Sequence, residues 1–213
     1  MTETTVHVVD DDPSFRTAMS RMLRASGYVV KTYGSAGEFL AERDSDEPGC
    51  LVVDLQMPGV GGLDLQSALA QSRAPMPVLF LTGHADTAST VRAMRSGAED
   101  FLEKTDPQDR LLDAIRRALV RDAAERRARV AQRELHGLFD TLTAREREVL
   151  GHVLQGRLNK QIAADLGIHE RTVKVHRKSL MTKLKVRSVA ALTRLAQEAG
   201  VDGPAAATFP LGQ

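Results

Sequence analysis

Polar side chains stand at the carboxyl ends of four short apolar runs. The first run ends in Asp10 and Asp11, and later runs end in Asp54, Thr82 and Lys104. Carboxylates crowded at the rim of an apolar core repel one another, and they stay ionised only where a cation or strong hydrogen-bond donors lie among them. Mg²⁺ prefers one or two carboxylates together with phosphate oxygens and water. If the runs converge, these groups lie at one rim of the fold and can bind Mg²⁺.

Five apolar runs alternate with five stretches of helical spacing in the first half of the chain. Several runs are nearly continuous Val, Leu and Phe, as expected of strands buried on both faces of a parallel sheet. The alternation predicts a doubly wound α/β domain, in which ligands bind beyond the carboxyl ends of the strands. The predicted strands are residues 5–10, 28–33, 50–54, 77–82 and 100–104, and the predicted helices are 14–25, 36–42, 62–71, 87–96 and one beginning near Pro107.

The third carboxylate of the first run, Asp12, has a different predicted role. It directly precedes Pro13. Asp is favoured at the N-cap of a helix, and Pro is favoured at the first helical position. We therefore expect Asp12 to start a helix, which leaves Asp10 and Asp11 as the candidates to bind a metal ion.

The charge of the chain is divided between its two ends. Its 213 residues carry a formal net charge of +1 and are 42% hydrophobic, which indicates a folded chain long enough for two domains. Residues 1–105 contain 9 Lys and Arg against 15 Asp and Glu, whereas residues 141–200 contain 12 against 5. An acidic part joined to a basic part suggests two domains, of which the basic one is the candidate to bind nucleic acid.

Cysteine content and hydropathy exclude several classes of protein. Cys50, the single cysteine, rules out a disulfide framework and a multi-cysteine metal site, and we expect it to be buried and unreactive. The N-terminus has no signal-peptide pattern, and no run of about 18 apolar residues could span a membrane. These features predict a cytoplasmic protein with no membrane partner.

The second half of the chain has a helical pattern throughout. Apolar residues recur at helical intervals through residues 107–142 among eight Arg, which predicts that the last helix of the first domain continues into a charged linker. Four shorter helices follow, and Thr143 with Glu146 forms a capping box at their start. Turns at Gly156, Gly167 and residues 186–187 separate them. The predicted divisions are a first domain at 1–120, a linker at 121–140, a second domain at 141–200 and a disordered tail at 201–213.

Residues 159–184 have the spacing of a helix-turn-helix, with Gly167 in the turn. At about 100° per residue, Val173, Leu180 and Leu184 share one face of the second helix, which we expect to pack in the core. A basic arc lies away from that face, and it suits the DNA major groove because it offers charges for phosphates and guanine edges and a methyl surface for thymine. A charged face exposed only to solvent is the alternative. The arc consists of Arg171, Lys174, Lys178 and Lys185, with Val175 at its edge.

The motifs at the predicted strand ends resemble those of bacterial response-regulator receivers of the FixJ/NarL kind. They are DD at 10–11, D at 54 with MPGVGG at 57–62, TGHAD at 82–86 and DFLEK at 100–104, all within the first 120 residues or so. The resemblance implies that Asp54 accepts a phosphoryl group and that Asp11 and Asp54 bind Mg²⁺ directly. It also implies that Asp10 binds the ion through water and that the backbone carbonyl of Gln56 completes the protein ligands.

Further roles follow from the same resemblance. Lys104 would bind the phosphoryl oxygens, Thr82 would move toward the phosphate, and Phe101 would turn inward. Thr105 departs from the family pattern, which usually has Pro after the lysine, often with a cis bond, so the loop geometry beside Lys104 is not predicted. We predict no role for His84, a histidine in a loop.

The C-terminal motifs resemble the LuxR/NarL-type DNA-binding domain. They are LTAREREVL at 142–150, NKQIAADLGI at 159–168, TVKVH at 172–176 and KL at 183–184. The resemblance implies that the second helix of the helix-turn-helix reads DNA, and that His176, on its inner flank, is structural. The implied base-facing residues are Lys174, Val175 and Lys178, and the implied phosphate contacts are Arg171, Thr172 and Arg187.

Together the two resemblances predict a response regulator with an α/β doubly wound receiver, built on a five-stranded parallel sheet, and an all-α, four-helix helix-turn-helix domain. A sensor histidine kinase would phosphorylate Asp54, and the receiver would then form a homodimer through its fourth helix and fifth strand. The C-terminal domain would bind promoter DNA, with RNA polymerase as a further partner. The chain would not be an enzyme, beyond at most slow self-dephosphorylation.

Two alternatives stand beside this interpretation. A haloacid-dehalogenase-like phosphatase also forms an aspartyl phosphate with Mg²⁺, but such enzymes carry Asp-x-Asp at the nucleophile. Here Asp54 is followed by Leu55 and Gln56, and no segment resembles a substrate cap. The second alternative, a receiver that signals without phosphate, would not need the complete acidic set.

Overall fold

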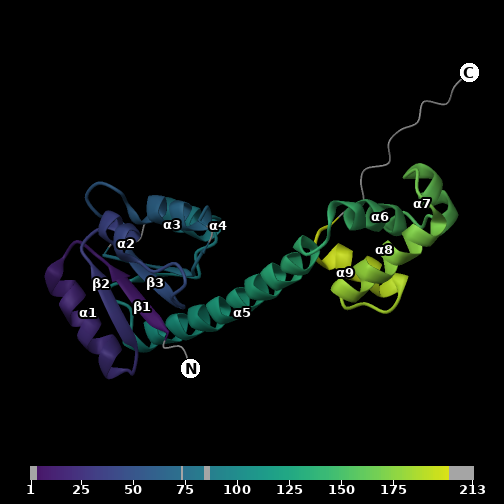
Figure 1. Cartoon of the computed structure of the whole chain (residues 1–213). Helices are drawn as coiled ribbons and strands as arrows, with labels where there is room; N and C mark the ends of the chain where they lie inside the picture. The colour runs from purple at the N-terminus through teal and green to yellow at the C-terminus, as the bar shows by residue number, and fades with distance from the viewer. Residues whose placement is uncertain (1–3, 73, 84–86, 202–213) are drawn as a thin grey trace, which may run out of the picture. The chain divides into compact units, whose positions relative to one another are not determined.

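The computed structural model describes residues 4–72, 74–83 and 87–201 of the chain (Figure 1). The chain divides into two compact units, Met1–Arg127 and Ala128–Gln213. The first is an α/β unit and the second is helical. We describe each unit by itself.

The N-terminal unit contains a parallel five-stranded sheet in the order β2-β1-β3-β4-β5. This topology confirms the predicted doubly wound fold, and each strand lies within two residues of its predicted bounds. The strands are β1 Thr5–Val9, β2 Val29–Tyr33, β3 Gly49–Asp54, β4 Val78–Thr82 and β5 Asp100–Glu103. The helices of this unit are α1 Pro13–Ala25, α2 Ala36–Glu42, α3 Gly62–Ala70, α4 Thr87–Arg95 and the first part of α5 Gln108–Asp140.

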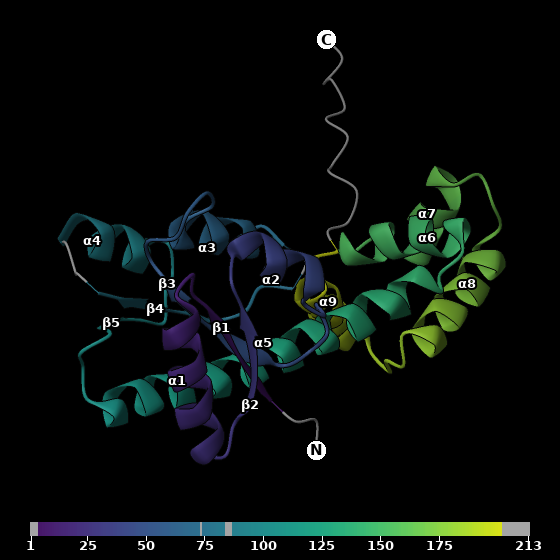
Figure 2. The ribbon, with the colours of Figure 1, turned by 90° about the vertical axis from the view of Figure 1, so that its left-hand side faces the viewer.

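Helices cover both faces of the sheet, with α2, α3 and α4 on one side and α1 and α5 on the other (Figure 2). The α3 side has a core that includes Phe39, Leu65 and Phe80, and the α5 side has a core that includes Leu23 and Ile115. Strands β1, β3 and β4 are buried on both faces because each face is covered by helices, as the sequence predicted, whereas the edge strands β2 and β5 are partly exposed.

Cys50 belongs to the core between the sheet and the α1/α5 pair, and it is fully buried. Burial raises the pKa of its thiol, because a thiolate would lose its hydration there. The prediction that this cysteine is buried is confirmed, and the raised pKa agrees with an unreactive thiol.

The predicted N-cap, Asp12, is present at the start of α1. The Asp12 side chain accepts hydrogen bonds from the backbone N–H groups of Ser14 at 2.8 Å and Phe15 at 3.3 Å, and Pro13 is the first helical residue. Asp12 therefore satisfies two N–H groups that have no partner within the helix. The chain turns sharply after β1, and Asp10 and Asp11 remain at the end of the strand.

Helix α5 is 33 residues long and runs without a break from the sheet into the predicted linker. Leu111, Ala114, Ile115 and Ala118 pack on the sheet, and the boundary between the two units falls at residues 127 and 128, inside the helix. The continuous helix was predicted. Within the described residues, no helix is long and apolar enough to cross a membrane. The predicted disordered tail lies outside the described residues from 202 onward.

Four short helices complete the C-terminal unit, as predicted. They enclose a core that includes Val149, Ile162, Val173, Leu180 and Leu192, together with Phe139 from the end of α5. The chain reverses direction at glycines with positive φ, which favours glycine over residues with a Cβ. The helices are α6 Ala144–Leu154, α7 Asn159–Asp165, α8 Glu170–Lys183 and α9 Val189–Glu198, and the turn glycines are Gly156 and Gly167.

Glu146 joins the first of these helices to α8. Its carboxylate completes the predicted capping box with Thr143, and it also accepts hydrogen bonds from Ser179 Oγ at 2.6 Å and Lys183 Nζ at 2.7 Å. These bonds lower the pKa of Glu146 to about 2, with Lys183 as the largest cause. The ion pair and the cap together fix α8 against α6.

Candidate functional site

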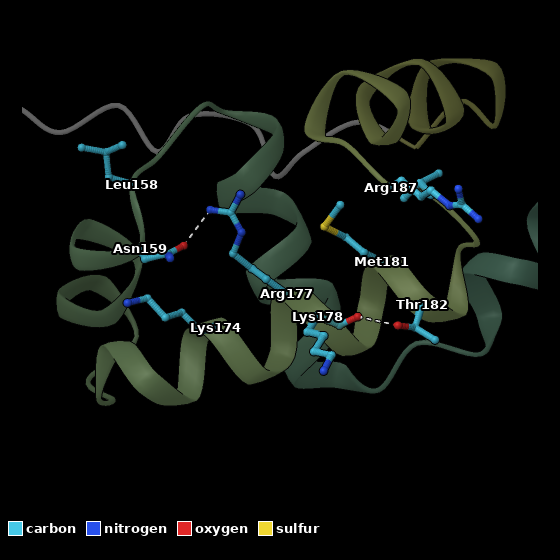
Figure 3. Close-up of a pocket in the computed structure, with 9 residues that line it drawn as sticks. Leu158, Asn159, Lys174, Arg177, Lys178, Met181, Thr182 and Arg187 are labelled. Carbon is cyan, nitrogen blue, oxygen red and sulfur yellow. Dashed lines mark hydrogen bonds between the residues drawn. The ribbon is translucent and has the colours of Figure 1, made fainter.

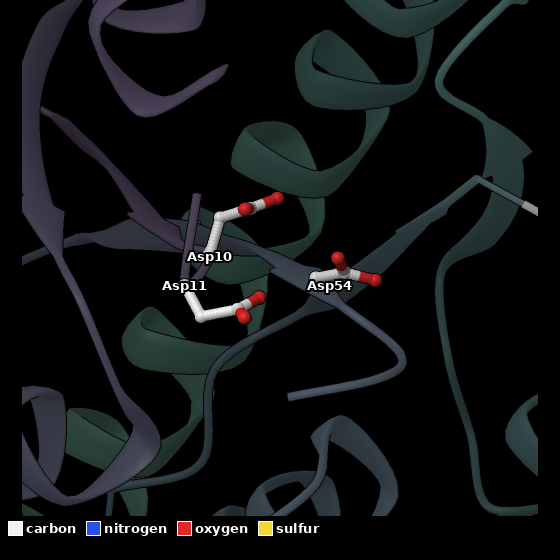
Figure 4. Close-up of side chains that lie close together, drawn as sticks. All are labelled: Asp10, Asp11 and Asp54. Atoms are coloured by element: carbon white, nitrogen blue, oxygen red, sulfur yellow. The ribbon is translucent and has the colours of Figure 1, made fainter. Parts of the chain in front are cut away.

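Three carboxylates meet at the carboxyl ends of β1 and β3 (Figure 4). Val9 pairs with Val53 in the sheet, so the residues that follow, Asp10 and Asp54, emerge side by side. Ligand oxygens of Asp10, Asp11 and Asp54 lie within 4.8 Å of one another. Asp10 and Asp54 are buried, whereas Asp11 is exposed. The convergence predicted from the strand ends is confirmed.

Lys104 neutralises part of this charge from the end of β5. Its Nζ lies 2.7 Å from Oδ2 of Asp10 and 2.7 Å from Oδ2 of Asp54. Burial alone would lower the pKa of Lys104, but the hydrogen bonds to Asp10 and Asp54 outweigh it and raise the pKa. The ammonium also lies 4.2 Å from the centre of the Phe15 ring, an arrangement that favours a cation. Lys104 is therefore charged and fixed between two carboxylates.

Backbone N–H groups bind the other carboxylate oxygens of Asp10 and Asp54. Oδ1 of Asp10 accepts the N–H of Asp12 at 2.9 Å, and Oδ1 of Asp54 accepts the N–H of Gln56 at 3.1 Å. The one lysine pairs with two of the three carboxylates, so the carboxylates outnumber the ammonium that binds them. Hard oxygen donors in excess over cations fit Mg²⁺, which would be held by Asp11 and Asp54 and supply charge neutralisation to a phosphoryl group.

Thr82 ends β4, and Phe101 lies within the neighbouring strand β5. Thr82 is buried at the end of β4, and its carbonyl accepts the N–H of Lys104 at 2.8 Å. Phe101 is half-buried, and its ring centre lies 6.0 Å from that of Phe80. The Lys104–Thr105 peptide bond is trans. His84 lies outside the described residues.

Gly62, at the start of α3, contributes to the site in a way that the sequence analysis missed. A Cβ at this position would meet the backbone oxygen of Asp54 at 2.5 Å and Cε1 of Phe80 at 2.9 Å, and both are closer than real Cβ contacts. The loop from Asp54 to α3 can therefore pack against β3 only with glycine here. The motif MPGVGG contains the signal, but the sequence does not show what the glycine approaches.

A hollow of about 640 Å³ lies on the basic side of α8 (Figure 3). It brings together Lys174, Lys178 and Arg187, which were predicted to contact DNA. Arg171 and Val175 are exposed on α8 and Thr172 is half-buried there, outside the lining of the hollow. The residues that line the hollow are Leu158, Asn159, Lys174, Arg177, Lys178, Met181, Thr182, Val186 and Arg187.

The predicted place of Lys185 on this helical face was wrong. Helix α8 ends at Lys183, and Lys185 follows it with φ 55°, so a helical projection does not apply to its side chain. His176 is half-buried, as its predicted position on the inner flank of α8 requires. Six of the nine residues that line the hollow were not predicted to contact DNA, and Asn159 and Arg177 are among them. Arg177 lies about 40° from Val173 on the helical projection, and a basic residue so close to the core face was the available signal.

Family models match most of the chain. Residues 6–116 match the response regulator receiver domain, and residues 140–196 match the luxR family of bacterial regulatory proteins. The chain is a response regulator. Nodulation protein W of Bradyrhizobium diazoefficiens is 42% identical over 200 residues, which cover 94% of this chain and 88% of that protein. Transcriptional regulatory protein FixJ of Azorhizobium caulinodans is 42% identical over 196 residues, which cover 92% of this chain and 93% of that protein.

Solved structures of other response regulators share this architecture. The response regulator StyR superposes with a TM-score of 0.79 at 46% identity, covering 92% of this chain and 99% of that chain. Full-length FixJ of B. japonicum gives a TM-score of 0.56 at 34% identity, covering 94% of this chain and 98% of that chain. The predicted family, fold class and function as a phosphorylation-dependent transcriptional regulator are confirmed. Residues 6–116 therefore belong to the receiver family and not to the haloacid-dehalogenase-like family of the alternative.

Proposed function

We propose that Asp54 of this response regulator is the phosphoacceptor and that the donor is the phosphohistidine of a sensor histidine kinase. One oxygen of Asp54 forms the new P–O bond as the P–N bond of the donor breaks, and the electron pair of that bond stays on the histidine nitrogen. The observation that carries the proposal is the Lys104 ammonium, which lies 2.7 Å from both Asp10 and Asp54. Phosphoryl transfer depends mainly on such positioning and charge neutralisation.

Mg²⁺ is the proposed cofactor, bound by Asp11, Asp54 and the carbonyl of Gln56, with Asp10 holding it through water. The three clustered carboxylates support this assignment. In it, Asp10 keeps Lys104 beside the phosphoryl oxygens, and Asp11, the exposed member of the cluster, faces the side from which the donor arrives. The chain acts as a phosphoacceptor and does not turn over a substrate of its own, apart from slow loss of its phosphate.

Phosphorylation is proposed to act through Thr82 and Phe101. The phosphate adds about −1.5 to −2 charge and three acceptor oxygens, which attract the Thr82 hydroxyl and the Lys104 ammonium. Phe101 then turns inward from its half-buried position. Val91 and Met94 expose 42% and 46% of their surface on α4, which supports a homodimer through α4 and β5 in the phosphorylated protein.

The C-terminal unit is proposed to bind promoter DNA with α8 in the major groove and to act with RNA polymerase there. Lys174 and Lys178 reach base edges, and Val175, which exposes 60% of its surface, offers methyl groups to thymine. The remaining contacts go to phosphates, and they come from Arg171, Thr172 and Arg187.

Phosphorylation of the full chain by acetyl phosphate and Mg²⁺ tests the receiver site. Asp54→Asn should abolish labelling because the amide cannot accept the phosphoryl group as a carboxylate does. Asp64→Asn, which changes an exposed carboxylate on α3, is the matched control and should label normally. Asp11→Ala should raise the Mg²⁺ concentration needed for labelling. Undiminished labelling of Asp54→Asn would overturn the assignment of the phosphoacceptor.

A further inference from the structure

Arg177 connects the two helices of the helix-turn-helix. It is half-buried on α8, and its NH1 group donates a hydrogen bond of 2.7 Å to Oδ1 of Asn159, the first residue of α7 (Figure 3). The guanidinium therefore points from α8 toward the start of α7. This bond fixes the direction of an otherwise flexible side chain.

The surroundings of Arg177 leave its charge uncompensated. Among the nine described residues that line the hollow, four are basic and none is acidic. Lys174 pairs with Glu170 at 3.0 Å and Lys183 pairs with Glu146 at 2.7 Å, but Arg177 forms no ion pair with the carboxylates of the described residues. Its partner Asn159 is neutral. A half-buried guanidinium among other cations is unfavourable without an anion, so the hollow is suited to bind one.

The direction of Arg177 distinguishes a backbone phosphate from a base. Lys174 and Lys178 lie about 100° and 140° from the core residue Val173 on the helical projection, whereas Arg177 lies about 40° away. In a helix-turn-helix, the second helix lies in the major groove while the first crosses the DNA backbone. Arg177 reaches sideways to the start of α7, the helix that would cross the DNA backbone in this docking geometry.

We infer that Arg177 binds a phosphate of the DNA backbone and that Asn159 is a positioning residue that orients its guanidinium. The inference depends on DNA binding by the C-terminal domain. One edge of the planar guanidinium donates to Asn159, and its remaining N–H groups can bind two oxygens of one phosphate. A lysine could donate to both partners but could not bind the phosphate through two parallel N–H groups, because its ammonium has no fixed planar geometry.

The test measures binding of the full-length, phosphorylated protein to two probes over a range of salt concentrations. One probe is a duplex of mixed sequence, and the other is a duplex selected from a random library by the wild-type protein. Arg177→Ala should weaken both probes equally, by roughly ten- to thirtyfold, and lower the salt slope by about one. Arg177→Lys should keep the salt slope but lose part of the affinity, because the charge stays and the geometry does not.

Asn159 is tested by its coupling to Arg177. Asn159→Ala should weaken both probes, and the double variant Asn159→Ala/Arg177→Ala should be no weaker than Arg177→Ala alone. Asn159→Asp should weaken DNA binding more than Gln161→Glu, which adds the same charge to an exposed position in the same helical turn. The reason is that an aspartate would hold the guanidinium in an ion pair and compete with the phosphate.

Several outcomes would overturn the inference. An unchanged salt slope in Arg177→Ala would show that Arg177 contacts no phosphate. Loss of affinity for the selected duplex alone would make Arg177 a base reader instead. Additive losses in the double variant would remove the positioning role of Asn159. Amide hydrogen exchange of α8 in each variant reports whether the helix is still folded, and failure of the wild-type protein to bind either duplex would refute DNA binding itself.

Discussion

Each unit of the response regulator contains a lysine paired with buried carboxylates, but the two clusters differ in their balance of charge. In the receiver, Nζ of Lys104 lies 2.7 Å from both Asp10 and Asp54, with Asp11 nearby. In the DNA-binding unit, Nζ of Lys183 lies 2.7 Å from Glu146 alone. The first cluster has three carboxylates for one ammonium, and the second has one carboxylate for one ammonium.

The hydrogen bonds of the two clusters differ in the same way. Both oxygens of Glu146 are bound, one by Ser179 and the other by Lys183 and the N–H of Thr143. These bonds stabilise the carboxylate in its charged form, which makes it unreactive. The receiver cluster holds like charges close together, and it becomes more stable when a cation or a change of state removes part of that charge. A buried carboxylate therefore indicates function where the charges are unbalanced and structure where they are matched.

Loss of Glu146 should give the largest effect on stability. Its pKa of about 2, against about 4.3 in an unfolded chain, corresponds to roughly 3 kcal/mol of stabilisation at neutral pH. Glu146→Gln should destabilise the C-terminal unit by about that amount, because Lys183 loses its partner as well. Hydrogen exchange of core amides in the full chain measures the change.

The control for that prediction is Glu148→Gln, two residues further along α6. Glu148 is exposed and pairs with Arg145 at the surface, so its loss should cost less than about 1 kcal/mol. The contribution of Glu146 is present above about pH 4.3 and is lost as the pH falls toward 2, because its pKa is lowered in the folded state. If the two variants lowered the stability equally, the Glu146 cluster would contribute no more to stability than a surface ion pair does.

Gly62→Ala should destabilise the receiver by about 1–3 kcal/mol, the usual range for overpacking a buried site. The added Cβ would meet the Asp54 backbone oxygen at 2.5 Å, so β3 or α3 must shift. Labelling by acetyl phosphate should slow as well, because Asp54 moves relative to Lys104. Gly37→Ala is the control. Its Cβ, in the first turn of α2, would meet nothing closer than 4.0 Å, and the change should stabilise the receiver because alanine is less flexible than glycine in the unfolded chain.

Asp11→Asn should stabilise its unit, whereas Glu146→Gln should destabilise its own. Removing one of three clustered charges should stabilise the receiver by about 1 kcal/mol in the absence of Mg²⁺, because the like-charge repulsion is reduced. Mg²⁺ should stabilise the wild-type protein and have much less effect on the variant. Thermal unfolding with and without Mg²⁺ provides the measurement. Destabilisation by Asp11→Asn without Mg²⁺ would contradict the view that this cluster is unbalanced.

The sequence predicted the site of the receiver well because its information is local. Each functional side chain follows a strand, and parallel strands in register bring their ends together, so recognising the strands was enough to place Asp10, Asp54, Thr82 and Lys104. The caps at Asp12 and Thr143 were also predictable, because a cap and the N–H groups that it binds are three residues apart or less.

The contacts that the sequence did not predict link segments that are distant in the chain. The close approach of Gly62 to Asp54 and Phe80 depends on how a loop folds back on the sheet. The bond from Arg177 to Asn159 joins two helices across a turn. Lys185 was wrongly given a helical position because the apolar spacing continues through Leu184, although α8 ends one residue earlier. Hydrophobic periodicity indicates which face is buried but does not mark where a helix stops.

The smallest change in stability should come from replacing Lys185. It has φ 55° and caps the end of α8, where its N–H donates to Thr182 O at 3.1 Å and the N–H of Val186 donates to Met181 O at 3.0 Å. This turn favours glycine, and a residue with a Cβ costs about 1–2 kcal/mol there. Because glycine is also more flexible in the unfolded chain, Lys185→Gly should stabilise the C-terminal unit by only about 0.5 kcal/mol net.

Lys185→Ala is the matched control, since it removes the same charge but keeps the Cβ. Hydrogen exchange should show a gain in stability for glycine and none for alanine, and both variants should lose the same amount of affinity for mixed-sequence DNA if the Lys185 charge contributes to binding. In that case the position keeps a strained lysine because its charge assists DNA binding, at the expense of stability. An equal gain in stability from alanine would show that charge repulsion within the basic surface, rather than backbone strain, destabilises this turn.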